Sequence, residues 1–232
     1  MAEGKPRLTY FAGRGLAEPI RLALSAAGIQ YEDVYLESRD QFLQLKQDGK
    51  LMFKQVPLLE VDGQCLIGGE AILRYACREG NFEGKTNEDK TRVDMLSMGA
   101  KDMVFPNLMS PTFIELMTSK EAADEAREKG VKESRERYLP VFEKLLDEST
   151  SGFLVGDSMT MADITFFDAL CYLHEDPKLK PELENFPRCS AFIDHFSQQP
   201  GIKEYLASPR RNPLPYPEYA QHCCEVLNLT GN

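Results

Sequence analysis

The chain has 232 residues, of which 42% are hydrophobic, so it can bury a substantial core as one large domain or two modest ones. Its formal net charge of −10 argues against a protein that binds the phosphate backbone of a nucleic acid. The sequence contains no signal-peptide pattern and no run of about eighteen apolar residues. We therefore predict a cytoplasmic protein with no nucleic-acid partner and no membrane association.

Strand-like and helical patterns alternate over the first 80 residues. Asp62-Gly63 favours a two-residue type I′ hairpin turn, because both central positions of that turn need a positive φ. The apolar residues after Gly69 recur at helical spacing. The elements predicted here are strands at 7–11, 31–36, 57–61 and 64–67, and helices at 18–27, at 40–47 and from residue 69 onward. The order βαβ and then ββα predicts an α+β domain.

A polar segment that contains glycine, residues 81–87, follows this first region. Beyond it, amphipathic patterns at 89–109 and 120–147 show almost no strand-like alternation, which predicts an all-helical second region. Thr160 and Asp163 have the spacing of a capping box at the start of a strongly apolar helix, a feature that serves folding rather than catalysis. We predict one domain at 1–80, a linker at 81–87 and a helical domain at 88–232.

The six cysteines and three histidines show no spacing typical of a disulfide scaffold or a metal site. We predict no bound metal and mostly buried, free cysteines. The adjacent Cys223 and Cys224 are expected to be the most exposed pair.

Two features near the strand ends can carry chemistry. Tyr10 ends the first strand and faces the turn that leads into the first helix. A tyrosine in this place is more often a half-buried core residue than a catalyst. Val56-Pro57 begins a later strand, and a cis bond there would leave free backbone groups for a peptide-like ligand, although only about 5% of such bonds are cis.

Five stretches together carry a resemblance to a known family. They are "YFAGRG", "DGKLMFKQVPLLEVDG", "ERYLPVFEKLL", "TMADI" and "SPRRNP". Over nearly its whole length the chain resembles the cytosolic glutathione transferases, most closely the alpha class. The resemblance implies a thioredoxin-like N-terminal domain, an all-α C-terminal domain, reduced glutathione as co-substrate and a homodimer. It implies an enzyme that conjugates glutathione to small hydrophobic electrophiles.

The resemblance also implies roles for individual residues. Tyr10 would hold the glutathione sulfur as a thiolate, and Gln55, Val56 and a cis Pro57 would bind the peptide backbone of glutathione. Lys46 would hold the glycyl carboxylate, Asp102 and Arg137 would reach the glutathione site of the other subunit, and Phe53 would lock into that subunit. Without the resemblance, Lys46, Asp102 and Arg137 would be interpreted as solvated helix charges. Gln55 would be interpreted as a turn residue and Phe53 as an ordinary core residue. The electrophile pocket would be lined by Phe11, Leu16, Leu108, Met109 and Leu214, together with part of the segment after Pro217.

The sequence departs from the alpha-class pattern at Gly68 and Gly69, where that class has a glutamine followed by threonine or serine. Those side chains grip the γ-glutamyl carboxylate of glutathione, whereas here only the amides of a helix N-terminus remain. Leu16 also replaces an arginine close to the sulfur.

Two functions stay open on this basis. The first is an active transferase, or a relative that uses glutathione in isomerisation or peroxide reduction. The second is a non-catalytic ligand carrier or crystallin-like structural protein with a weakened glutathione site. The C-terminal segment also allows two readings, because residues 218–227 have the pattern of an amphipathic helix but an exposed tail is nearly as common at a chain end.

Overall fold

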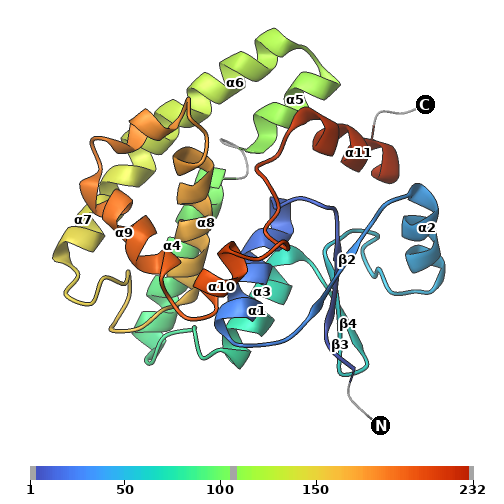
Figure 1. The fold of residues 1–232 in the computed structure, drawn as a ribbon, viewed down its shortest axis with the longest axis horizontal. Helices are drawn as coiled ribbons and strands as arrows, with labels where there is room; N and C mark the ends of the chain where they lie inside the picture. The colour runs from blue at the N-terminus through green and yellow to red at the C-terminus, as the bar shows by residue number, and fades with distance from the viewer. Residues whose placement is uncertain (1–3, 105–108, 230–232) are drawn as a thin grey trace.

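The computed structural model describes residues 4–104 and 109–229. Figure 1 shows a sheet with its helices on one side of the molecule and a larger bundle of helices on the other. The first part has the order βαβ and ββα that the sequence predicts. In the second part, every regular element among the described residues is a helix. The predicted α+β class is confirmed.

The sheet has four strands in the order β2-β1-β3-β4. β1 and β2 are parallel, whereas β3 is antiparallel to both β1 and β4. The turn between β3 and β4 has positive φ angles at Asp62 (49°) and Gly63 (73°), as the predicted type I′ turn requires. The elements of this region are β1 Arg7–Tyr10, α1 Glu18–Ala26, β2 Glu32–Tyr35, α2 Arg39–Gln47, β3 Leu58–Val61, β4 Gln64–Ile67 and α3 Gly69–Glu79, with the short 3-10 helix η1 Gly15–Ala17 before α1.

The amphipathic pattern predicted at 120–147 is divided between two helices in the structure. A five-residue π-helix, η3 Ser134–Tyr138, separates α6 from α7. Pro140 has no amide proton to donate, so the regular α-helical ladder cannot continue through the start of α7. The helices are α4 Asn87–Met103, α5 Ser110–Met117, α6 Lys120–Glu133, α7 Leu139–Glu148, α8 Met161–His174, α9 Pro187–Ser197, α10 Ile202–Leu206 and α11 Pro217–Leu227, with the 3-10 helix η4 Lys180–Leu183 before α9.

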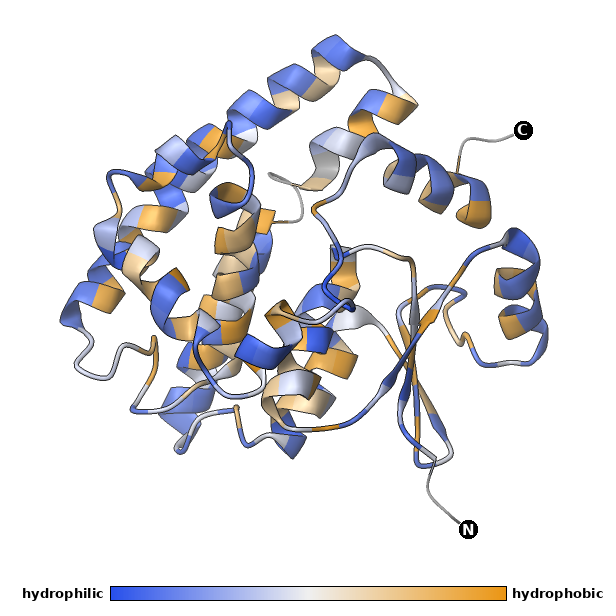
Figure 2. Cartoon of the chain, in the orientation of Figure 1, coloured by the Kyte–Doolittle hydropathy of each residue, from blue (hydrophilic) through white to orange (hydrophobic). Residues whose placement is uncertain are grey.

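Helix α8 forms the centre of the helical region. Every residue from Met161 to Leu173 is buried, and the hydrophobic colouring in Figure 2 follows this helix. At its start the Asp163 carboxylate accepts hydrogen bonds from the Thr160 amide (2.8 Å) and from the Leu154 amide (2.8 Å). The Thr160 and Asp163 pair singled out in the sequence therefore fixes the start of the helix that the others surround.

The cysteines are all free, and the expectation for Cys223 and Cys224 is wrong. Both are buried, whereas Cys65 is exposed. The reason is that α11 packs on α2 and α5, which covers the face of α11 that carries these two residues. Within residues 4–104 and 109–229, no helix is long and apolar enough to cross a membrane. The same residues contain no cluster of three or more metal-ligating side chains.

Candidate active site

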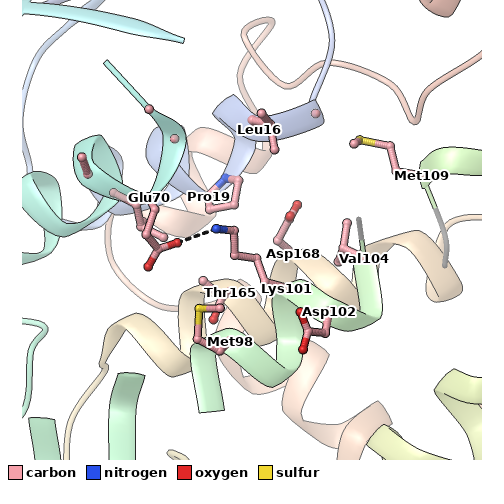
Figure 3. A pocket seen from close by; sticks show the side chains of 15 residues that line it. Leu16, Pro19, Glu70, Met98, Lys101, Asp102, Val104, Met109, Thr165 and Asp168 are labelled. Atoms are coloured by element: carbon pink, nitrogen blue, oxygen red, sulfur yellow. Dashed lines mark hydrogen bonds and ion pairs between the residues drawn. The ribbon is translucent and has the colours of Figure 1, made fainter. Parts of the chain in front are cut away.

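A cavity of about 720 Å³ lies between the sheet region and the helical region. Figure 3 shows it enclosed by the start of α1, the start of α3 and one face each of α4 and α8. Its walls are mostly apolar, with a few charged groups at defined places. The residues that line it are Gly15, Leu16, Pro19, Gly68, Gly69, Glu70, Ala71, Leu73, Met98, Lys101, Asp102, Val104, Met109, Thr165 and Asp168.

Tyr10 lies directly behind the turn that forms one end of this cavity. Its hydroxyl oxygen accepts a hydrogen bond from the Leu16 amide at 3.2 Å. A side chain at Gly15 would place its Cβ only 2.7 Å from that hydroxyl, so glycine is needed for this close approach. Burial raises the pKa of Tyr10 above its ordinary value, although the Leu16 hydrogen bond opposes the change. The hydroxyl therefore stays protonated at neutral pH and can act as a hydrogen-bond donor.

Buried arginines hold the turn in place. Arg21 of α1 donates to the Gly13 carbonyl at 2.7 Å and to the Asp33 carboxylate at 2.9 Å. Arg14 donates to the Asn212 carbonyl at 2.8 Å and pairs with Glu175 at the end of α8. These contacts join the turn to β2, to α8 and to the C-terminal segment. The position of Tyr10 is consequently fixed by groups from both regions of the chain.

The C-terminal segment is an ordered helix that covers the Tyr10 end of the cavity. Tyr219 of α11 is only 4% exposed. Its ring would overlap a side chain at Gly13, because the nearest ring carbon lies 2.1 Å from the Cβ position of that residue. A hydrogen bond from the Tyr219 side chain lowers the pKa of Tyr10, opposing the larger effect of burial. Of the two readings of this segment, the covering helix is the correct one.

The other end of the cavity is built from backbone and from a charged pair. Gly68 is the N-cap of α3, with φ 88° and no side-chain cap. Such a φ is readily adopted only by glycine, so Gly68 satisfies a backbone requirement in addition to lacking the alpha-class side chain. Beside it, Lys101 Nζ of α4 forms an ion pair with Glu70 Oε2 at 2.8 Å, drawn as the dashed line in Figure 3.

A buried carboxyl group lies on the α8 wall. Asp168 is 3% exposed, and its Oδ1 has no hydrogen-bond partner among the described residues. Figure 3 shows the side chain directed toward Leu16, Val104 and Met109. Burial raises the pKa of Asp168 to about 7, while the charge of Arg14 acts in the opposite direction. This end of the cavity therefore contains an acid that is partly protonated near neutral pH.

The structure places most of the residues predicted to bind glutathione near the cavity. The Val56-Pro57 bond is cis, as the resemblance implied. Pro57 lies 3.9 Å from the Cβ position of Gly69, and Gln55 Nε2 lies 3.9 Å from that of Gly68. Asp102 lines the cavity itself.

Several other predicted residues do not line this cavity. Lys46 lies on α2 with its ammonium group 5.5 Å from the centre of the Phe42 ring. The guanidinium carbon of Arg137 lies 5.0 Å from the centre of the neighbouring Tyr138 ring.

The structure brings only some of the residues predicted for the electrophile pocket to this cavity. Leu16 and Met109 line the cavity. Phe11, which follows the end of β1, instead packs between Tyr10, Tyr219 and His222 beneath α11. Leu214 is half-buried against the core and does not line the cavity. Leu108 lies outside the described residues.

Sequence reasoning missed Lys101, Glu70, Asp168 and Tyr219. Asp168 had a usable signal, since it is an ionisable residue inside an otherwise apolar helix. Tyr219 also had one, because it lies on the apolar face of the amphipathic C-terminal pattern. Lys101 and Glu70 had none, because each resembles an ordinary helix surface charge until α3 and α4 are brought together.

Comparisons with known proteins agree with this geometry. Residues 6–78 match the family model for the N-terminal domain of glutathione S-transferases, and residues 107–209 match the model for the C-terminal domain. The chain is 37% identical over 228 residues to the rat protein named Glutathione S-transferase alpha-4, which covers 98% of this chain and 100% of that one. The chain belongs to the glutathione S-transferase family.

Solved structures of two nematode proteins are similar as well. The glutathione S-transferase from Ascaris lumbricoides has a TM-score of 0.73 and 35% identity, covering 92% of this chain and 100% of its own. Na-GST-3 from the hookworm Necator americanus, described as monomeric, has a TM-score of 0.72 and 30% identity, covering 88% of this chain and 96% of its own.

Proposed function

We propose that the protein conjugates reduced glutathione, through its thiol, to small hydrophobic electrophiles, with Tyr10 as the catalytic residue. The observation that carries the proposal is the cavity between the two regions, which joins the Tyr10 turn to the start of α3 and to an apolar wall. Glutathione would lie along the sheet side, with its cysteinyl backbone at Gln55, Val56 and Pro57. Lys46 is retained from the resemblance as the residue that holds the glycyl carboxylate.

The energetic demand on Tyr10 is modest. A thiol with a pKa of about 8.5 is roughly 3% ionised at neutral pH, and lowering that pKa to about 6.5 takes roughly 2.7 kcal/mol of selective thiolate stabilisation. One or two hydrogen bonds to the charged sulfur supply this amount. Because burial keeps Tyr10 protonated, its hydroxyl can donate such a bond while the thiol loses its proton. After the thiol proton passes to solvent, the thiolate forms a carbon–sulfur bond to an electrophilic carbon held against Leu16, Val104 and Met109. With an aryl halide the carbon–halogen bond breaks and the halide leaves with its electron pair.

The test is retention on immobilised glutathione followed by a conjugation assay with an activated aryl halide. We expect retention and saturable turnover that requires glutathione. Retention without turnover, for the aryl halide and for peroxide alike, would favour the non-catalytic alternative, for which nothing in the fold or the comparisons argues. Loss of both would overturn the proposal.

We further propose a homodimer in which Asp102 and Arg137 serve the glutathione site of the partner. Phe53 is 70% exposed, so its phenyl ring is accessible to a partner chain. A second cavity of about 590 Å³, lined in part by Met95, Leu96 and Val141, offers an apolar recess that a partner's phenyl ring could fill.

Light scattering tests the dimer. We expect twice the 26.3 kDa chain mass for the native protein and a single chain mass for Phe53→Ser. A native monomer, as in the hookworm relative, would contradict the proposal.

Two coarser features complete the proposal. The six free cysteines fit a reducing compartment, which supports the cytoplasm as the location. The domain boundary is placed in the segment 81–87, between the end of α3 at Glu79 and the start of α4 at Asn87.

A further inference from the structure

The ion pair between Glu70 and Lys101 lies on the cavity wall next to the glycines that begin α3 (Figure 3). Lys101 Nζ is 2.8 Å from Glu70 Oε2, and both side chains remain partly accessible, at 38% and 29%. The pair joins a helix of the sheet region to a helix of the helical region. It is therefore fixed by the same packing that forms the cavity.

Each member of the pair keeps unused bonding capacity, and the unpartnered Glu70 oxygen is itself buried. Glu70 Oε1 has no hydrogen-bond partner among the described residues. Arg74 Nη2 lies 3.4 Å from it, within ion-pair distance but without hydrogen-bond geometry, and Arg74 is already bonded to Asp94 at 2.6 Å. The ammonium group of Lys101 has three donors and one acceptor in Glu70 among the described residues.

The location of the pair raises an electrostatic question. The first amides of α3 have no acceptor within the helix and favour a carboxylate in front of them. Glu70, in the first turn of α3, would repel that carboxylate. Lys101 offsets this repulsion. A ligand that carries both a carboxylate and an ammonium group could pair its carboxylate with Lys101 and its ammonium group with Glu70.

We propose that Lys101 and Glu70 together bind the α-amino-acid end of glutathione, Lys101 holding the α-carboxylate beside the Gly69 amide and Glu70 accepting the α-ammonium group. This rests on the proposed function, because it assigns residues to a glutathione molecule in this cavity. It also explains how the site works with glycines at 68 and 69. A residue from the helical region supplies the charge that the start of α3 lacks.

The experiment is calorimetric titration with glutathione and two analogues that each lack one charge. 4-Aminobutanoyl-cysteinyl-glycine lacks the α-carboxylate, and glutaryl-cysteinyl-glycine lacks the α-ammonium group. The variants are Lys101→Met and Glu70→Gln, with Lys129→Met on the exposed face of α6 as the control for a lost surface charge. Thermal unfolding of each variant checks that it is folded.

We expect Lys101→Met to weaken glutathione binding about 10- to 100-fold, because it removes a charge-assisted hydrogen bond and leaves Glu70 facing the carboxylate. The same variant should bind the aminobutanoyl analogue as well as the native protein does. Glu70→Gln should weaken glutathione but leave the glutaryl analogue unchanged. Lys129→Met should match the native protein for all three ligands.

Each other outcome is decisive. If Lys101→Met weakens glutathione and both analogues equally, the pair only braces the two regions and the inference is wrong. If a variant fails to fold, the native protein can still overturn the inference, because both analogues must bind at least about 10-fold more weakly than glutathione. If the native protein binds glutathione and both analogues with one affinity, the inference fails while the proposed function stands. If it binds none of them, the proposed function itself fails.

Discussion

The two ends of the cavity are built by different means. At the Tyr10 end, the tyrosine side chain is fixed by the Leu16 amide, by the turn that Arg21 anchors and by α11, which covers it. At the α3 end there are two glycines and a charged pair whose lysine belongs to another helix. One end therefore presents a buried hydroxyl, and the other presents backbone amides beside two partly exposed charges.

The two ends of the cavity differ in how much amino-acid substitution each tolerates. A buried hydroxyl fixed by three elements tolerates little substitution, because any replacement leaves a space or an unpaired group. Charges on flexible side chains can be supplied from several nearby backbone positions, so their function can move from one helix to another. The α3 end can therefore lose its alpha-class side chains while the Tyr10 end keeps its tyrosine.

The largest effect is expected from Tyr10→Phe. Removing the hydroxyl removes a hydrogen bond that forms mainly with the ionised sulfur, so the conjugation rate should fall about 10- to 100-fold, or about 1.4 to 2.7 kcal/mol in the activation barrier. Glutathione affinity should change little, because the α3 end is untouched. Steady-state kinetics measures the rate, and calorimetric titration with glutathione measures the affinity. Tyr75→Phe, a half-buried tyrosine of α3, is the matched control, and an unchanged kcat for Tyr10→Phe would remove Tyr10 from the mechanism.

A second variant displaces α11, which covers the Tyr10 end of the cavity, and leaves the α3 end unchanged. In Gly13→Ala the new Cβ would lie 2.1 Å from a ring carbon of Tyr219, so α11 must move away. Overpacking of this kind costs about 1 to 3 kcal/mol, and hydrogen exchange in residues 217–227 should accelerate about 10-fold or more. Gly99→Ala, where the nearest atom is 4.0 Å away, should leave that exchange unchanged. Equal protection of α11 in both variants would show that Tyr219 does not hold the helix in place.

The buried carboxyl near the Tyr10 end gives a prediction about pH. Because burial raises the pKa of Asp168 to about 7 in the folded state, against about 3.9 when unfolded, the folded protein binds the extra proton between these values. The stability that the protonated group contributes is complete below about pH 4 and is lost as the pH rises through about 7. Asp168→Asn should therefore be about 1 to 3 kcal/mol more stable than the native protein at pH 8 and about equal to it at pH 4.

Denaturant unfolding at the two pH values measures this difference. Asp157→Asn is the control, because Asp157 is exposed and its pKa is lowered by Lys85, so its removal should bring no gain at pH 8. A gain for Asp168→Asn that is the same at both pH values would mean that the stability change does not come from titration of this carboxyl.

The same contrast explains what the sequence could predict. The hairpin at Asp62-Gly63, the capped start of α8 and the place of Tyr10 at the end of β1 depend on neighbouring residues, so local patterns indicate them. The amphipathic pattern at 120–147 indicated helix but not the break between α6 and α7 at η3. Phe11 was placed in the electrophile pocket on the resemblance alone, whereas its packing against Tyr219 and His222 depends on α11, which is distant in the sequence. Lys101 could not be assigned, because its role depends on a contact between two helices that no local pattern encodes.

The smallest effect concerns the α3 end and tests whether a side chain there adds anything to the charged pair. Gly69 is the better site for it than Gly68, because φ at Gly68 is 88° and a side chain there would cost about 1 to 3 kcal/mol of folding stability. In Gly69→Ser the new Cβ would lie 3.3 Å from the Leu16 carbonyl oxygen, which a shift of a few tenths of an ångström relieves. The hydroxyl would add one donor to a carboxylate already held by Lys101, so glutathione affinity should rise only about 3- to 10-fold. Calorimetric titration measures the gain, and Gly68→Ala should instead lower the Tm without changing the affinity of the molecules that remain folded. A Gly69→Ser variant that folds normally and binds glutathione no more tightly would show that the amides and Lys101 already saturate the carboxylate.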